Sequence, residues 1–314
     1  MRTMINMNEI QQAVAILRSG GLVAFPTETV YGLGADANNA EAVAKVFAAK
    51  GRPHDHPLIV HIASVAHLSD WAAEVPETAL KLAKAFWPGP LTMVFRKKAQ
   101  VLSCVTGGQE TVAIRVPAHE MASALLQAFG GGLVAPSANQ FTHVSPTSAA
   151  AVNEELAGKV DLVLEGGECR VGVESTIVDM TSDVPVVLRP GMITVDQIQQ
   201  VLGQPVLRLQ PKSDIRVPGQ HIVHYAPRTK TVVMASHVLH QMQGNVAFMV
   251  LSDFVSTNKV VKMSSSPDEY ARELYRVLRE LDKLGFEKIV VEAVPSGIAW
   301  DAIRDRLKKA SGEA

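Results

Sequence analysis

Hydroxyl and carboxyl side chains gather directly after a short apolar segment near the N-terminus. Leu22–Phe25 is apolar, and Pro26 then begins a polar stretch that contains Thr27, Glu28 and Thr29. Ligands commonly bind where strands end at the rim of a sheet, because the loops there can carry polar side chains. The stretch therefore either binds a ligand or forms a turn in which the hydroxyl groups only close the loop.

Two cations are held close together in the segment KGRP at residues 50–53. Lys50 supplies a compact charge and Arg52 a planar fork of donors, a combination that suits a polyphosphate. The alternative is that both side chains only complement the carboxyl end of a helix, where cations are favoured.

Several potential metal ligands follow, but their spacing is not that of a metal site. His54, Asp55, His56 and His61 match no zinc pattern and have no second cluster, so we expect no bound metal. His61 lies inside the apolar segment 57–62, where it is either a core histidine or points into a pocket.

Arg115 lies in the middle of a segment that reads as a strand, TVAIRVP at 111–117, with Thr111 on the same side. A buried arginine must find an anion. That anion is either a structural aspartate or glutamate, or the carboxylate of a ligand.

Three later segments add polar groups beside predicted strands. In APSAN at 135–139, small residues such as Ala135 let a ligand approach the backbone, and Ser137 and Asn139 can both face a phosphate or a ribose. Ser145 precedes a helix, where it either faces an anion at free N–H groups or serves as an N-cap. Ser175, in GVEST at 172–176, and Arg189, in LRPG at 188–191, adjoin two further strands. No GxSxG motif is present, so we expect no serine nucleophile.

The elements that position these residues alternate along residues 1–205. The apolar pattern predicts helices at 9–19, with Asn8 as N-cap, and at 40–49, 65–73 and 77–86. It predicts strands at 22–25, 58–62, 91–95, 112–116, 133–135, 162–164, 176–179 and 186–188. This pattern is typical of an α/β or α+β domain with a twisted sheet.

The pattern changes in residues 206–230, which are rich in proline and have no clear period, so we interpret them as a linker. Residues 231–314 then predict strands at 231–234, 246–251, 260–263 and 289–293, and helices at 268–284 and 299–309. Such alternation indicates a small parallel sheet of Rossmann type, although GxGxxG is absent.

Composition narrows the classes of function. The 314 residues are 47% hydrophobic and carry a net charge of −1, so the chain as a whole is not a polyanion binder. Two cysteines are too few for a disulfide framework and fit a reducing cytoplasm, and no apolar run predicts a membrane span. A basic stretch is either a solvated face or a surface for tRNA; it consists of Lys81, Lys84, Arg96, Lys97 and Lys98.

Taken together, the motifs resemble the YrdC-like threonylcarbamoyl-AMP synthase family. The matching segments occur in order and cover the first domain; they are PTETVYGLGA at 26–35, KGRP, PLIVHI at 57–62, WPGPLT at 87–92, TVAIRVPAH at 111–119, APSAN, SPT at 145–147, GVESTIVD at 172–179 and LRPG. The linker, which carries HYAP at 224–227, and the second domain resemble the longer, two-domain form.

The resemblance implies two sets of site residues in a cationic cavity. It assigns L-threonine to Thr29, His61, Arg115, Ala135 and Ser175. It assigns ATP to Lys50, Arg52, His56, Thr111, Ser137, Asn139, Ser145, Arg189, and His224 or Tyr225, with Lys50 and Arg52 in catalytic roles. The family more often has asparagine where this chain has His56.

The implied reaction joins L-threonine, bicarbonate and ATP into L-threonylcarbamoyl-AMP and pyrophosphate, for N6-threonylcarbamoyladenosine in tRNA. ATP is a substrate, and Mg²⁺ is expected to arrive with it. Downstream threonylcarbamoyl-transfer proteins are expected partners, and tRNA is a candidate one; the oligomeric state is left open. The main alternative is a non-catalytic RNA-binding module. A hydrogenase-maturation carbamoyltransferase would need zinc-finger modules that two cysteines cannot build, and a one-domain paralogue would lack the second domain.

Overall fold

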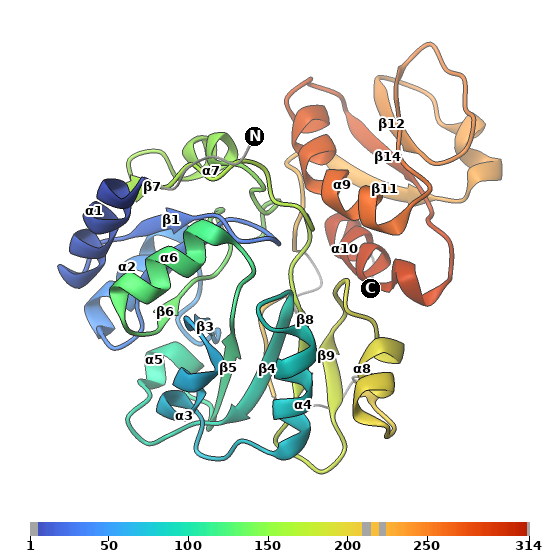
Figure 1. Cartoon of the computed structure of the whole chain (residues 1–314). Coiled ribbons are helices and arrows are strands. Elements are labelled where there is room, and N and C mark those ends of the chain that lie inside the picture. The colour runs from blue at the N-terminus through green and yellow to red at the C-terminus, as the bar shows by residue number, and fades with distance from the viewer. Residues whose placement is uncertain (1–5, 209–214, 220–223, 313–314) are drawn as a thin grey trace.

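The described residues form two β-sheets, one of ten strands and one of four. The computed structural model describes residues 6–208, 215–219 and 224–312. Figure 1 shows the large sheet with its covering helices and, beside it, the small sheet with α9 and α10. The predicted architecture, a twisted mixed sheet followed by a small Rossmann-like parallel sheet, is confirmed.

The large sheet mixes parallel and antiparallel pairs in the order β10-β9-β8-β4-β5-β3-β6-β2-β1-β7. Parallel β3 and β5 lie side by side near its middle, and β4 and β8 continue the sheet on one side. The strands are β1 Val23–Phe25, β2 Gly32–Asp36, β3 Ile59–His61, β4 Leu91–Arg96, β5 Thr111–Arg115, β6 Leu133–Val134, β7 Leu162–Val163, β8 Thr176–Asp179, β9 Val186–Arg189 and β10 Leu207–Arg208.

Two groups of helices cover the large sheet. Helices α1 and α6 share one apolar core with β1, and α2, α4 and α7 share another with the opposite side of the sheet. The helices are α1 Met7–Arg18, α2 Ala40–Lys50, α3 Leu68–Trp71, α4 Glu77–Phe86, α5 Ser103–Thr106, α6 Glu120–Phe129, α7 Ala149–Leu156 and α8 Val195–Leu202.

The second half of the N-terminal motif forms a strand, β2, which the sequence did not predict. Strand β2 pairs antiparallel with β1, which brings Gly34 opposite Val23. A Cβ at Gly34 would lie 2.8 Å from the ring of Phe25, and one at Gly32 would lie 3.0 Å from Ala135. The glycines therefore allow close backbone approach, which outweighs their poor strand propensity.

Two helix starts also differ from the prediction. Asn6, and not Asn8, is the N-cap of α1, and its side chain accepts from the backbone N–H of Asn8 at 3.1 Å. The expected helix at 65–73 is a 3₁₀ turn, Val65–His67, followed by the short α3.

The second sheet is parallel throughout, in the order β11-β14-β12-β13. The long helix begins at Pro267, one residue before the predicted start, and Ser266 is its N-cap. The elements are β11 Lys230–Met234, η2 Ser236–Gln241, β12 Val246–Val250, β13 Lys259–Lys262, α9 Pro267–Asp282, β14 Lys288–Glu292, η3 Ile298–Trp300 and α10 Asp301–Ser311. The limits of the domains at 205 and 230 stay predictions, and residues 209–214 and 220–223 of the predicted linker lie outside the described residues.

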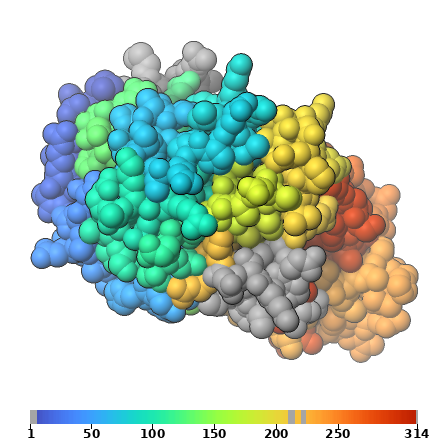
Figure 2. Space-filling model, turned by 90° about the horizontal axis from the view of Figure 1, so that it is seen from below, coloured from blue at the N-terminus to red at the C-terminus, as the bar shows by residue number. Residues whose placement is uncertain are grey.

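An apolar cluster joins the two parts of the chain. Val30, Val144 and Val173 pack with the buried face of α9, and Tyr225 joins the same cluster. Figure 2 shows, from below, that the yellow segment with α8 adjoins the red C-terminal part. No helix among the described residues is both long and apolar enough to cross a membrane.

Candidate functional site

Polar residues occupy one face of the large sheet between two apolar covers. His61 of β3 and Arg115 of β5 are direct partners in the parallel register. Side chains alternate between the two faces along a strand, so His61 lies on the same face as Ile59, and Arg115 on the same face as Ala113. Ile59 and Ala113 pack with Val217. Helices α1 and α6 cover this face farther along, where the ring of Phe25 lies 6.3 Å from that of His61.

The anion that Arg115 requires is supplied within the protein by Glu28. Nη2 of Arg115 lies 2.7 Å from Oε1 of Glu28, and both side chains are buried. Nη1 donates to Oγ1 of Thr29 at 2.9 Å, and the second carboxylate oxygen of Glu28 accepts from the N–H of Ala118. The polar stretch after β1 therefore orients Arg115. This orientation leaves the guanidinium able to face a ligand carboxylate as well.

His61 is a neutral side chain in this site. Burial, reinforced by the charge of Arg115, lowers its pKa from 6.5 to about 3. Its Nδ1 atom is buried and has no hydrogen-bond partner among the described residues. A buried ring nitrogen without a partner favours the pocket interpretation over that of a satisfied core histidine.

Ser175 connects the two predicted sets of residues. Its hydroxyl lies 2.7 Å from that of Thr92, and Nη2 of Arg189 donates to the same hydroxyl at 3.2 Å. Two nitrogens of Arg189 also donate to the carbonyl of Ser175, at 3.1 and 2.9 Å. A residue assigned to threonine thus directly contacts one assigned to the nucleotide.

Lys50 ends α2 because Gly51 adopts a left-handed conformation, with φ of 61°. Its ammonium group donates to the carbonyls of Ser137 and Asn139, the latter at 2.6 Å. Burial, and then the charge of Arg52, holds the pKa of Lys50 well below its usual value. The segments KGRP and APSAN are therefore in direct contact.

Arg52 lines a cavity of about 230 Å³ together with His56, Phe141, Arg216 and His224. One of its terminal nitrogens donates to the carbonyl of Pro57 at 2.9 Å, and its buried Nε has no partner among the described residues. Burial and the nearby Arg189 lower its pKa to about 10. The imidazole of His56 packs at 5.4 Å from the ring of Phe141.

The HYAP segment closes one wall of this cavity. His224 contributes directly to the lining, and burial holds its pKa well below the usual value. Tyr225 is 1% exposed and has φ of 59°, which costs a non-glycine residue roughly 1–3 kcal/mol. Gly219 makes room for its hydroxyl, which would lie 2.2 Å from a Cβ at that position.

Ser145 does not cap a helix, since Ser148 is the N-cap of α7. Its hydroxyl donates instead to Oε1 of Glu174 at 2.6 Å.

Ala135 follows β6, and its N–H donates to the carbonyl of Ile59 in β3. Thr111 lies half-buried at the start of β5, opposite Arg96, so its assignment to ATP rests on the resemblance alone.

Sequence reasoning left out four residues that organise the site: Glu28, Thr92, Glu174 and Arg306. Glu28 and Glu174 lie inside motifs that the sequence singles out, so the motifs indicated these positions but did not indicate what the two side chains do. The sequence gave no indication of a role for Arg306, because this residue is one of several cations in a polar helix.

Three buried cations of the site form no ion pair with a carboxylate in the described part of the chain. Lys50, Arg52 and Arg189 are 3%, 8% and 3% exposed. Within residues 6–208, 215–219 and 224–312, no carboxylate forms an ion pair with any of them, and their donors reach only carbonyl and hydroxyl oxygens. Burying unpaired charge is costly, so this arrangement is typical of a site for an anionic ligand.

Other charged groups offer no comparable site. No group of three potential metal ligands occurs in the described part of the chain. In the basic stretch, Lys81 pairs with Glu77 and Lys97 with Glu110, both at the surface. These acids reduce the local positive charge that an RNA surface would need.

The fold and the site define an α/β protein with a cluster of buried cations on a mixed sheet, next to a cavity that Arg52 lines. A family model described as "Telomere recombination" matches residues 15–191, and one described as "Threonylcarbamoyl-AMP synthase, C-terminal domain" matches residues 193–312. The chain therefore belongs to the threonylcarbamoyl-AMP synthase family, in its two-domain form.

Similar proteins match this chain over nearly its whole length. The threonylcarbamoyl-AMP synthase of Pyrococcus abyssi is 40% identical, with 99% of this chain and 98% of that protein covered. The Bacillus subtilis enzyme is 41% identical, with 98% and 94% covered. A crystal structure of P. abyssi Sua5 complexed with L-threonine superimposes with a TM-score of 0.93 at 41% identity, covering 99% of this chain and 96% of that one.

Proposed function

We propose that this protein is a nucleotidyltransferase that makes L-threonylcarbamoyl-AMP and pyrophosphate from L-threonine, bicarbonate and ATP. The product serves the formation of N6-threonylcarbamoyladenosine in tRNA. Membership of the family supports this activity, and the threonine complex of the P. abyssi relative supports the amino acid.

The observation that carries the proposal is the set of buried cations that form no ion pair with a carboxylate among the described residues. A triphosphate would supply the missing negative charge for Lys50, Arg52 and Arg189. It would also favour the charged form of Lys50, whose pKa is held down by burial and by Arg52. An RNA-binding module would need such charges on an exposed surface and not in a buried hollow.

The amino acid is assigned to the neighbouring part of the same sheet face. Arg115, held by Glu28 and Thr29, binds the threonine carboxylate. The hydroxyls of Thr29 and Ser175 and the neutral ring of His61 face its polar side, and Ala135 leaves room beside the backbone. Neutral His61 does not repel the threonine ammonium, which a protonated ring would do.

The chemistry follows from this arrangement. The threonine amine, after losing a proton, attacks the carbon of CO2 derived from bicarbonate and forms a carbamate. A carbamate oxygen then attacks the α-phosphorus of ATP, and the bond to pyrophosphate breaks. The carbamate is short-lived in water, so a closed cavity protects it. No covalent enzyme intermediate is required.

Lys50 and Arg52 stabilise the charge that develops on the phosphates in this step. The remaining nucleotide contacts are assigned to His56, Thr111, Ser137, Asn139, Ser145, Arg189, and His224 or Tyr225. A P. abyssi Sua5 variant with adjacent histidine and tyrosine replaced by alanine has also been solved, with a TM-score of 0.92. This chain contains one His-Tyr dipeptide, His224-Tyr225.

We assign Mg²⁺ to the nucleotide and not to side chains. The described residues contain no cluster of three metal ligands, and Glu174, a buried acid that interacts electrostatically with Lys50 and Arg189, is already bound by Arg306, Tyr275 and Ser145. Oxygen-rich phosphates suit Mg²⁺, so the ion enters with ATP.

The product must leave for a second reaction, which transfers its threonylcarbamoyl group to adenosine. We therefore propose downstream threonylcarbamoyl-transfer proteins as partners, with tRNA as a candidate partner. The free thiols of Cys104 and Cys169 are consistent with our proposal of a cytoplasmic location.

Replacing Arg52 by alanine tests the role in phosphate binding. We expect threonine-dependent release of pyrophosphate from ATP to fall at least a hundredfold, as a lost charged contact to phosphate costs about 3 kcal/mol. Circular dichroism should show an intact fold. Full activity in this variant would refute the phosphate role, and a wild-type protein that binds RNA but releases no pyrophosphate would favour the alternative.

A further inference from the structure

A buried ion pair joins the two parts of the chain beside the proposed nucleotide site. Glu174 directly precedes Ser175 and β8 of the large sheet, whereas Arg306 belongs to α10 of the second domain. Nε of Arg306 lies 2.7 Å from Oε2 of Glu174, and the arginine side chain is fully buried. Burial opposes ionisation of Glu174, but Arg306 and Arg189 hold its pKa at about 2.

Arg306 also contacts two segments of the nucleotide site. Its Nη1 donates to the carbonyl of Pro190, the residue after Arg189, at 3.1 Å. Its guanidinium lies 5.1 Å from the centre of the Tyr225 ring, a distance typical of a cation–π contact. Because Tyr225 has a positive φ, it needs such contacts to keep its conformation.

Glu174 completes the same network from the other side. Its Oε1 accepts from the hydroxyl of Ser145 at 2.6 Å, and its Oε2 accepts from the hydroxyl of Tyr275 at 2.9 Å. The ring of Tyr275 is in turn stacked on Tyr225, with centres 5.8 Å apart. The pair thereby reaches Ser145, Arg189 and Tyr225, three positions assigned to ATP.

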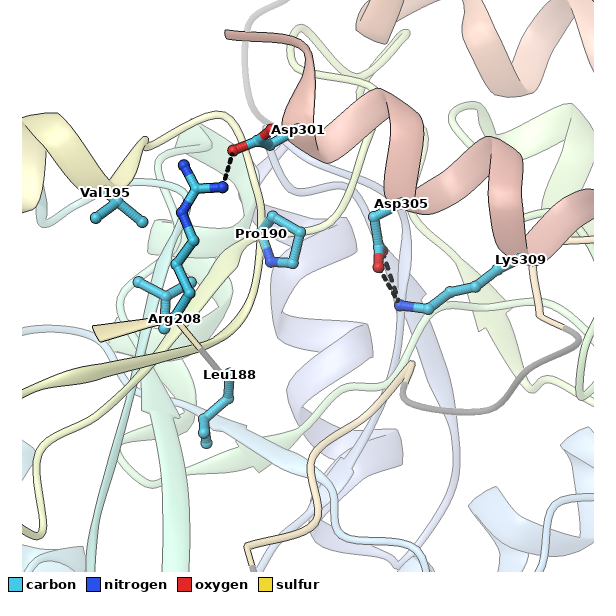
Figure 3. A pocket seen from close by; sticks show the side chains of 8 residues that line it. Leu188, Pro190, Val195, Arg208, Asp301, Asp305 and Lys309 are labelled. Carbon is cyan, nitrogen blue, oxygen red and sulfur yellow. Dashed lines mark hydrogen bonds and ion pairs between the residues drawn. The ribbon is translucent and has the colours of Figure 1, made fainter. Parts of the chain in front are cut away.

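Arg306 has two charged neighbours in α10, Asp305 and Lys309, which form an ion pair with each other. Figure 3 shows that Asp305 and Lys309 pair with each other beside Pro190 at the edge of a cavity of about 440 Å³. Arg306 is bonded on both sides, because its Nη1 donates to Asp305 at 2.6 Å while its Nε donates to the buried carboxylate of Glu174 at 2.7 Å. The side chain of Arg306 therefore bonds to Glu174 and Pro190, and α10 reaches the nucleotide segments a second time through the backbone carbonyl of Lys309, which accepts from the N–H of His224 at 3.2 Å.

We propose that Glu174 and Arg306 are positioning residues through which the second domain sets the affinity for ATP without touching it. Together they hold the hydroxyl of Ser145 and the ring of Tyr225 in the positions that the nucleotide requires. This inference rests on the proposed function, since it assumes that ATP binds at these segments. Glu174 and Arg306 are not themselves assigned to the ligand.

Two single variants and one double variant test the pair. Glu174→Gln keeps the shape but removes the charge, and Arg306→Lys keeps the charge but loses the fork. The double variant Glu174→Gln/Arg306→Gln removes both charges of the pair, so neither partner is left charged alone, and it keeps the test valid if a single variant fails to fold. Lys283→Met is the matched control, because it breaks an exposed ion pair with Glu154 that also joins the two domains, at 2.7 Å.

The measurements are the dissociation constants of α,β-methylene-ATP and of L-threonine by calorimetry, together with both KM values. We expect the analogue to bind about tenfold more weakly or worse in the pair variants, with threonine affinity changed less than about twofold. Lys283→Met should change neither. Unchanged analogue affinity, or equal losses for both ligands, would overturn the inference. A wild-type protein that binds both ligands but makes no adenylate would instead contradict the proposed function.

Discussion

Glu28 and Arg115 form a buried pair on the sheet face, at the position that we assign to threonine. With a carboxylate on one side, the guanidinium is fixed in orientation before any ligand arrives. The need for an anion could be predicted from an arginine inside an apolar strand. Its identity could not, because Glu28 and Arg115 are far apart along the chain and meet only through the folded sheet.

Replacing Glu28 by glutamine should destabilise the protein. The change leaves Arg115 buried without its carboxylate, and breaking a buried pair in this way costs about 3–5 kcal/mol. Urea unfolding measures the loss. The control is Glu110→Gln, which removes an exposed carboxylate from its pair with the half-buried Lys97 and should cost less than about 1 kcal/mol. Equal losses in the two variants would show that burial does not set the strength of these pairs.

His61 should make the protein sensitive to acid. Its pKa is about 3 in the folded protein and has its ordinary value of 6.5 in the unfolded chain, so below pH 6.5 the unfolded chain binds a proton that the folded one does not. Stability is therefore lost as the pH falls from 6.5 towards 3.

A His61→Gln variant removes this contribution. Between pH 7 and pH 5, its free energy of unfolding should fall by about 2 kcal/mol less than that of the wild type. His224 titrates in both proteins and cancels from the comparison. Parallel pH profiles of stability for the two proteins would contradict the burial of a neutral His61.

At the scale of elements, the hydrophobic periodicity and the positions of glycine and proline predicted most strands and helices, because these signals are local in the sequence. Strand β2 was missed because Gly32 and Gly34 argue against a strand locally, and only the close approach of Phe25 and Ala135 explains them. The partners of β3 could not be predicted either. Its register with β5 puts His61 beside Arg115, and that contact depends on the whole sheet.

Gly172 shows how one loop permits two elements to dock. It has φ of 81°, and a Cβ there would lie 2.4 Å from the carbonyl oxygen of Ala271 in α9. Gly172→Ala should therefore lower stability by about 1–3 kcal/mol beyond the cost of the backbone conformation. Gly167→Ala is the control, with φ of 79° and no atom within 4 Å. Thermal unfolding compares the two, and equal melting temperatures would contradict tight docking of α9.

At the scale of the molecule, the two parts share one apolar cluster as well as the Glu174–Arg306 pair. The family resemblance indicated a second domain that reaches the nucleotide through HYAP. It could not indicate that α9 and α10 also pack against the motifs of the first domain, because their buried residues form an ordinary amphipathic pattern.

Removing residues 206–314 should therefore do more than shorten the chain. The truncated protein loses His224 and Tyr225 and exposes Val30, Val144 and Val173 to water. We expect the rate of pyrophosphate release to fall about tenfold or more, which corresponds to about 1.4 kcal/mol of lost binding. A truncated protein as active as the full chain would show that the second domain has another role.

The most direct test of the whole account is mass spectrometry of the products formed from ATP, L-threonine and ¹³C-labelled bicarbonate, with serine as competitor. We predict threonylcarbamoyl-AMP that carries the label, formed together with pyrophosphate. A preference over serine of roughly 10–200-fold is the most that one methyl group can provide. Hydrolysis of ATP without a labelled adenylate, or no reaction at all, would contradict the account.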